Sequence, residues 1–203
     1  MGRPQTFETD EVVRAARAVF WRDGYESASL PDLEQATGLS RSSLYHAFGS
    51  KRGLFDAAVT SYLDEVIRPR LHPLTVAHVK PGAVVRYLVG LRAALNRPGS
   101  LPSTSGCLLI NVAGAPVGRD DAVREVVAAY RTELGTALRR GVAAHSSHRS
   151  DVEQDRLAET LTGLVVAALA VVRVDRPAAL RLLDTALELL ADTPSGDPTV
   201  PPA

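Results

Sequence analysis

The sequence predicts an all-α protein of about nine helices, with a three-helix domain at the N-terminus and a larger helical domain behind it. Apolar residues recur three and four positions apart through most of the chain, and no stretch alternates as a strand does. Serine, glycine and proline stand where helices are expected to begin and end. We therefore divide the chain into a three-helix domain (1–50), a larger helical domain (51–192) and a proline-rich tail (193–203) that is expected to be disordered.

The composition is that of a globular protein, with 45% apolar and 23% charged residues. The single cysteine, Cys107, excludes an internal disulfide. The longest uncharged apolar run (161–172) is too short to cross a membrane, and the polar N-terminus does not have the pattern of a signal peptide. We therefore expect a cytoplasmic protein that makes no contact with a membrane.

The charges cancel overall but are unevenly placed. Residues 1–55 carry seven basic and seven acidic side chains, yet no acidic one lies between Glu34 and Asp56. This interval is expected to form a positive edge, and local cations favour contact with phosphates even when the net charge is zero. The basic side chains of the interval are Arg41, His46, Lys51 and Arg52.

The first helix is expected over 9–24, with Thr9 as its N-cap and Gly24 at its end. Its apolar side would brace the two helices that follow. Trp21 stands beside Phe20 on this helix, so it is expected in the core of the domain rather than at a ligand.

Residues 29–48 predict two short helices joined by a tight turn. Ser29 can cap the first helix, and Asp32 three positions later can complete a capping box. Gly38 follows where a helix commonly ends in a left-handed residue. Ser40 can then cap a second helix over 41–47. This arrangement is typical of a helix-turn-helix that reads DNA.

The second of these helices would bury little and expose much. Leu44 and Phe48, four positions apart, can face inward. Tyr45 can reach DNA through its hydroxyl group, or it can pack against Phe48 as part of the core. The polar side chains at the start of the helix or on its outer side are Arg41, Ser42, Ser43, Tyr45 and His46.

The joint pattern over 7–55 resembles the N-terminal domain of TetR-type transcriptional regulators. The resemblance covers about a quarter of the chain densely, and the remainder is similar only in length and in its helical character. The matching residues are Val19-Phe20, Gly24-Tyr25, Ser29-Leu30, Asp32-Leu33, Ala36, Gly38-Leu39-Ser40, Leu44-Tyr45, Phe48, Ser50-Lys51 and Leu54-Phe55.

The resemblance implies a repressor that a small-molecule effector releases from a palindromic operator in double-stranded DNA. Residues 1–50 would be the helix-turn-helix DNA-binding domain, and 51–192 the effector-binding and dimerisation domain. Arg41 would read a guanine edge and Lys51 would bind a phosphate. The positions expected to contact DNA are Ser29, Ser40, Arg41, Ser42, Ser43, Tyr45, His46 and Lys51.

The remaining helices follow from apolar spacing and from breakers. Ser50 can cap a long fourth helix, which Pro69 is expected to end, and a breaker-rich connection would follow over 72–82. The segments 97–106 and 145–150 read as loops. The helices predicted after residue 50 span 51–68, 81–96, 107–113, 119–144, 151–174 and 177–191.

The last two of these helices predict a homodimer. They are apolar around so much of their circumference that a single packing face cannot cover them. The same pair from a second copy would complete a four-helix bundle, whereas in a monomer they would be ordinary core helices. The apolar positions are Leu157, Leu161, Leu164, Val165, Ala168, Leu169, Val172, Leu180, Leu182, Leu183, Leu187, Leu189 and Leu190.

The body of the protein leaves room for an effector pocket. The candidate lining residues read equally well as plain core, and Asn111 either orients a ligand or caps a backbone group. The few aromatic residues favour a small effector that is mostly apolar or acidic. The candidates are Tyr62, Val66, Leu88, Leu91, Leu108, Asn111, Val112, Val127 and Tyr130.

No catalytic motif appears, so an enzyme is not expected. His145 and His148 lie in a polar loop without a fixed acid or cysteine beside them, which argues against a metal site. No cofactor is predicted. Cys107 precedes an apolar run and is more typical of a buried core cysteine than of a sensor. The alternatives are a helical adaptor that binds protein rather than DNA and a small helical enzyme.

Overall fold

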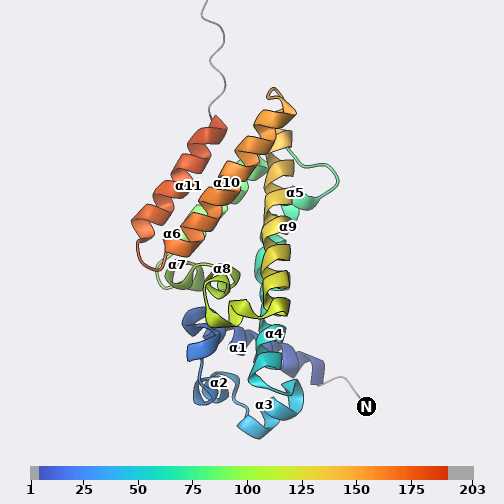
Figure 1. Cartoon of the computed structure of the whole chain (residues 1–203), viewed down its shortest axis with the longest axis vertical. Helices are drawn as coiled ribbons and strands as arrows, with labels where there is room; N and C mark the ends of the chain where they lie inside the picture. Colours follow the sequence, from blue (N-terminus) through green and yellow to red (C-terminus); the bar gives the residue numbers. More distant parts are fainter. Residues whose placement is uncertain (1–4, 192–203) are drawn as a thin grey trace, which may run out of the picture.

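The computed structural model describes residues 5–191, with side chains from Thr9 onward. This part of the chain folds into eleven α-helices, one π-helical turn (η1) and one 3-10 turn (η2), and it contains no strand (Figure 1). The elements are α1 (Gln5–Ser27), α2 (Leu30–Thr37), α3 (Arg41–Phe48), α4 (Lys51–Tyr62), η1 (Leu63–Ile67), α5 (Arg68–Thr75), α6 (Ala83–Asn96), α7 (Leu101–Ser105), α8 (Leu108–Ala113), η2 (Pro116–Arg119), α9 (Asp121–His145), α10 (Asp151–Val171) and α11 (Arg176–Ala191).

The predicted fold class is confirmed. Helices α1 to α3 gather at one end of the molecule, α4 leads away from them, and α9 runs along the remainder (Figure 1). Helices α10 and α11 lie side by side, with α10 against α9 and α11 against α6. Within the described residues, the eleven helices reduce to the predicted nine when α4 and α5 count as one and the five-residue α7 is left out. We call residues 5–50 the head and residues 51–191 the body.

One apolar core extends through both parts of the molecule. It runs from Ala16 and Phe20 in α1, through Tyr62 at the end of α4, to Leu183 and Leu190 in α11. Buried aromatic rings pack where the head meets the body, with Phe20 edge-on against Phe55 at 5.3 Å between ring centroids. The head therefore shares its core with the body and is not joined to it by a linker alone.

The predicted end of the fourth helix was wrong. The chain continues through Pro69 as α5, so the expected connection over 72–82 begins four residues later than predicted. The π-helical turn η1 explains the continuity, because its wider spacing pairs the amide of Arg68 with the carbonyl of Leu63. Pro69 then stands in the first turn of α5, where a missing N–H is harmless, and Pro73 lies exposed inside it.

Smaller corrections concern the ends of other helices. Helix α1 begins at Gln5 rather than at Thr9, because no breaker separates these residues, and its backbone leaves the helical region at Gly24 before a last turn. The loop predicted over 97–106 contains α7, since Pro102 suits a first helical turn. Helix α10 ends at Val171, three residues earlier than predicted. Residue 192 and the tail lie outside the described residues. No helix within 5–191 is both long and apolar enough to cross a membrane.

Candidate functional site

The turn between α2 and α3 is built from the local caps that the sequence predicted. Ser29 Oγ accepts from the amide of Asp32 at 3.2 Å, and the Asp32 carboxylate accepts from the amide of Ser29 at 3.2 Å, which completes the capping box. The Ser29 hydroxyl also donates to the Asp32 carboxylate, and this bond, followed by the one from the Ser29 amide, lowers the pKa of Asp32. Gly38 adopts the left-handed conformation (φ 70°), and Ser40 Oγ accepts from the amide of Ser43 at 3.3 Å. These contacts fix the angle at which α3 leaves the turn.

Helix α3 presents most of its surface to solvent. Leu44 is its one buried residue, and Phe48 is half-buried. Tyr45 is also half-buried, with the Arg41 guanidinium 5.4 Å from its ring centroid. Tyr45 therefore remains compatible with both predicted roles, contact with DNA and packing in the core, because the residue is only partly buried. The exposed residues of this helix include Arg41, Ser42, Ser43 and His46.

A groove of about 560 Å³ separates α3 from the start of α1. Ser42, Ser43 and His46 line its outer wall, while Val12 and Phe48 form its apolar floor. The hydroxyl groups of Ser42 and Ser43 lie 2.9 and 3.0 Å from Ser40 Oγ, so the cap also orients two groups of this surface. Ser29 and Ser40, which the sequence assigned to DNA contact, serve as N-caps in the structure.

The two cations that open α4 are already engaged. Lys51 is half-buried, with its Nζ 4.7 Å from the Tyr25 ring centroid and 3.4 Å from the Glu26 carbonyl oxygen. Arg52 pairs with Asp56 at 2.8 Å and with Asp120 at 2.9 Å. The predicted positive edge is therefore shorter than the sequence indicated, because Arg52 binds an acid 68 positions away. Ser50 caps α4 as predicted, accepting from the amide of Gly53 at 3.0 Å.

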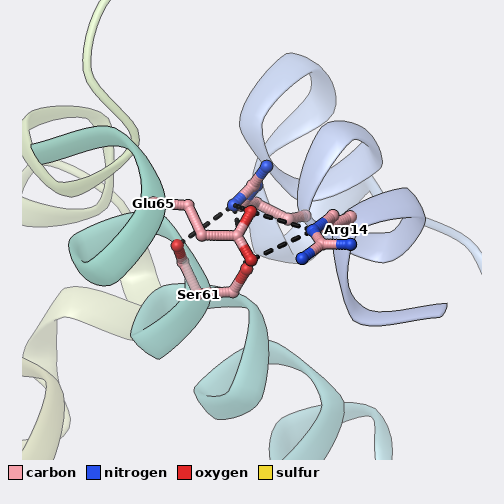
Figure 2. Close-up of polar contacts among 4 residues, drawn as sticks. Arg14, Ser61 and Glu65 are labelled. Carbon is pink, nitrogen blue, oxygen red and sulfur yellow. Dashed lines mark hydrogen bonds and ion pairs between the residues drawn. The ribbon is translucent and has the colours of Figure 1, made fainter. Parts of the chain in front are cut away.

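A cluster of polar side chains joins α1 to the π-helical turn (Figure 2). Arg14 Nε donates to both oxygens of the Glu65 carboxylate at 3.0 Å. Arg17 Nη1 donates to the same carboxylate at 2.9 Å, to Ser61 Oγ at 2.8 Å and to the Ser61 carbonyl at 3.0 Å. Figure 2 shows Glu65 reaching from its helix towards Arg14 on the facing one. We call these four residues the outer seam between head and body.

A second set of contacts joins the other side of α1 to α7 and η2. The buried Trp21 indole donates to the Gly106 carbonyl at 3.0 Å and packs edge-on against Tyr62. The amide of Val117 donates to the Glu26 carboxylate at 2.7 Å. We call Trp21, Glu26, Gly106 and Val117 the inner seam. The prediction that Trp21 belongs to the core is confirmed, since 5% of it is exposed.

The body contains two adjoining cavities, an outer one between α5 and α6 and an inner one that α4, α9 and α10 also line. The outer one measures about 410 Å³ and the inner one about 20 Å³, and they share Arg70, Tyr87 and Leu91. Tyr62 and Tyr130, two of the predicted effector-site residues, line the inner cavity. A third cavity, of about 190 Å³, lies between α4, α8 and α9.

The other predicted effector-site residues are spread more widely. Val112 lines the third cavity, and Leu88 and Leu108 lie in the core. Val66 and Val127 are partly buried against that core. Asn111 Nδ2 donates to the Ser105 carbonyl at 2.6 Å, so its amide holds a backbone group.

Three polar residues of the two adjoining cavities escaped the sequence analysis. Arg70 was missed because the fourth helix was expected to end before it, and Arg86 because an exposed arginine gives no periodic signal. Tyr87 could have been found, since it stands three positions after Val84 and four before Leu91, on the buried side of α6.

The remaining candidates for chemistry do not form a site. Cys107 is buried, and its thiol donates to the Tyr130 hydroxyl at 3.7 Å. His145 ends α9 and His148 lies in the turn that follows. Within the described part of the chain, no group of three or more His, Cys, Asp or Glu side chains could hold a metal ion.

Comparison with known sequences agrees with this geometry. The family model described as "Bacterial regulatory proteins, tetR family" matches residues 12–58. The transcriptional repressor ComR of Escherichia coli K12 is 44% identical over 63 residues, which are 31% of this chain and 30% of ComR. The alignment thus spans less than a third of that relative. The repressor BdcR of the same organism is 24% identical over 167 residues, which are 82% of each protein.

Comparison with solved structures extends over nearly the whole chain. The TetR family transcriptional regulator CifR, in a complex with 26-bp double-strand operator DNA, is 31% identical. The superposition has a TM-score of 0.73 and covers 92% of this chain and 98% of CifR. A TetR regulator from Chloroflexus aurantiacus J-10-FL is 27% identical, with a TM-score of 0.73 and coverage of 94% and 95%.

Proposed function

Because the chain belongs to the TetR family of bacterial regulatory proteins, we propose that it is a DNA-binding transcriptional repressor. The observation that carries the proposal is helix α3, which buries Leu44 alone and exposes Arg41, Ser42, Ser43 and His46. A helix that short has no packing reason to display so many donors. The CifR structure supports the proposal, since that relative is bound to operator DNA.

The roles of single residues follow from their positions. Arg41 reads a guanine edge, Ser42 and Ser43 contact bases or phosphates, and Tyr45 and His46 hold the DNA backbone. Lys51 binds a phosphate together with the first amides of α4, which have no acceptor inside their helix. Ser29 and Ser40 support DNA binding indirectly, because they cap α2 and α3. The DNA-binding domain comprises residues 1–50 and the effector-binding and dimerisation domain residues 51–192.

The repressor acts as a homodimer on a palindromic operator. In α11 the inner positions Ala179, Leu183, Ala186 and Leu190 are buried, whereas four leucines next to them remain half-exposed in the single chain. A second copy of α10 and α11 would cover these leucines and complete a four-helix bundle. The half-exposed leucines are Leu180, Leu182, Leu187 and Leu189.

A small-molecule effector releases the repressor by shifting its population between two arrangements of the heads. The effector site lies in the body, and its signal reaches the head through α4 and η1, which form one continuous run with α5. The protein works in the cytoplasm, where its DNA is found, and it needs no catalytic group.

The test is the affinity of the purified full-length protein for the DNA that flanks its own coding region, measured by fluorescence anisotropy. We expect Arg41→Ala to lose about 1–3 kcal/mol of binding free energy, because a bidentate contact with guanine disappears. Arg97→Gln, which changes an exposed arginine of the body, should bind as the wild type does. Equal binding by Arg41→Ala, or a monomeric mass in light scattering, would refute the proposed way of reading DNA.

A further inference from the structure

The outer cavity between α5 and α6 has the form of a ligand site. Its volume of about 410 Å³ lies within the range of small-molecule pockets. Pro69 and Pro73 of α5 face Gly90, Leu91 and Ala94 of α6 across it, so most of the lining is apolar and small. Such walls suit a flat or extended hydrocarbon group.

The polar groups at this cavity carry one sign of charge. Arg70 and Arg86 both line it, and no Asp or Glu lines either the outer or the inner cavity. Neither arginine has an acidic partner within residues 9–191. Two other arginines of α5 and α6 do have acidic partners. Arg68 pairs with Asp64 and Glu133, and Arg92 pairs with Asp184. Two unpaired guanidinium groups at one apolar pocket favour an anion and disfavour an amine.

Tyr87 lines both the outer and the inner cavity. Its hydroxyl has no hydrogen-bond partner among the described residues, although burial raises the pKa of this phenol, as it does for Tyr62 and Tyr130. Arg70 lines the inner cavity together with Tyr62 and Tyr87, and its positive charge opposes this rise in pKa at both phenols. The three tyrosines therefore remain neutral hydrogen-bond donors at neutral pH.

We propose that this cavity is the effector site and that its ligand is a small carboxylic acid with an apolar body. The carboxylate binds the guanidinium groups of Arg70 and Arg86 at the mouth, and the apolar body lies between the two prolines and the Gly90 face of α6. Tyr87 marks the inner limit of the ligand. The proposal deepens the proposed function and rests on it, since it names the class of molecule that the regulator senses.

The position of the cavity explains how such a ligand would act on DNA binding. Helix α5 is the direct continuation of η1, whose Glu65 holds Arg14 and Arg17 of the head (Figure 2). A ligand bound between α5 and α6 would move α5. Glu65 lies three residues before the start of α5, so the movement would pass through Glu65 to the head. The outer seam thereby couples the acid to the angle of α1.

The first experiment measures binding to the full-length protein by calorimetry, with octanoate and 4-phenylbutanoate as probes. Octanamide and octylamine serve as neutral and cationic controls. We expect at least one acid to bind, and to bind about tenfold or more tightly than the amide, since charge-assisted hydrogen bonds are lost in the amide. Arg70→Gln and Arg86→Gln should each weaken acid binding about tenfold, whereas Arg97→Gln, at the opposite end of α6 from Arg86, should not.

Three results would overturn the proposal: no binding of either acid at millimolar concentration, equal binding of acid and amide, or an equal loss in Arg97→Gln. Operator affinity without any probe is measured on the same samples. If the protein binds the operator but no acid, the proposed carboxylic-acid ligand is refuted and the proposed repressor function is retained. If the protein binds an acid through Arg70 and Arg86 but does not bind the operator, the proposed repressor function is refuted and the proposed acid site is retained.

Discussion

The two seams that join the head to the body use different physics. The inner seam is mostly buried: the Trp21 indole donates to the Gly106 carbonyl inside the shared core, and of the four residues Glu26 is the exposed one. The outer seam is an ion-pair cluster, and the side chains of Arg14 and Glu65 are 47% and 36% exposed. Buried packing and hydrogen bonds stabilise a fold strongly, whereas exposed ion pairs contribute about 0–1 kcal/mol. The inner seam should therefore contribute more to stability, and we expect the outer seam to act on the angle of the head.

The largest effect is expected from Gly106→Ala in the inner seam. Gly106 has a φ of 66°, and an added Cβ would lie 2.1 Å from the Leu169 carbonyl oxygen and 3.2 Å from Val172 Cγ1. We expect a loss of more than about 3 kcal/mol in the free energy of unfolding, from strain and from displacement of α10. Urea denaturation measures it.

Gly99→Ala is the matched control for this substitution. Gly99 has a similar φ of 73°, but nothing lies within 4 Å of its added Cβ. It should lose only the cost of the backbone conformation, about 1 kcal/mol. Equal losses in the two variants would show that the close approach to α10 does not matter.

Trp21→Phe should have the next largest effect. The phenyl ring fills part of the indole site but leaves the Gly106 carbonyl without its donor in a buried place. An unpaired buried acceptor costs about 1–3 kcal/mol, which urea denaturation resolves. A loss below about 0.5 kcal/mol would mean that the inner seam depends on packing alone.

Glu65→Gln tests the outer seam and should separate stability from function. The amide loses its charge pairing with Arg14 and Arg17, so the free energy of unfolding should change by less than about 1 kcal/mol. Operator affinity should fall several-fold, because α1 is no longer held at one angle. Asp64→Asn is the control. Asp64 lies in the same π-helical turn, but its partner Arg68 belongs to the body and not to the head. If both variants bind DNA equally well, the outer seam does not set the angle of the head.

Contacts within a short stretch of chain could be predicted from the sequence, as the helix caps show. The caps made by Ser29, Gly38, Ser40 and Ser50 were predicted because each one acts within four residues of chain. Their geometry depends on local backbone chemistry, which short stretches specify. The exposed surface of α3 followed from the same local pattern.

Contacts between distant segments could not be predicted in this way. Arg52 looked like a free cation, yet its partner Asp120 lies 68 positions along the chain. The cavity at Arg70 exists only because η1 carries the helix past Pro69, and that turn depends on the packing of α5 against α9 and α6. The sequence therefore predicted the candidate DNA-binding surface in more detail than the candidate effector site.

The smallest expected effect is the pH dependence of the outer seam. Hydrogen bonds from Arg14, and then from Arg17, hold the pKa of Glu65 below its ordinary value of 4.5. The unfolded chain therefore binds the proton more readily, and the pairing contribution is complete above about pH 4.5. It disappears as the pH falls through the lowered pKa of the folded protein. Because the side chain is 36% exposed, screening reduces this contribution to a few tenths of a kcal/mol. The difference in unfolding free energy between wild type and Glu65→Gln should therefore shrink below that pH. A difference that stays constant through the acid range would assign the effect of the substitution to packing instead of charge.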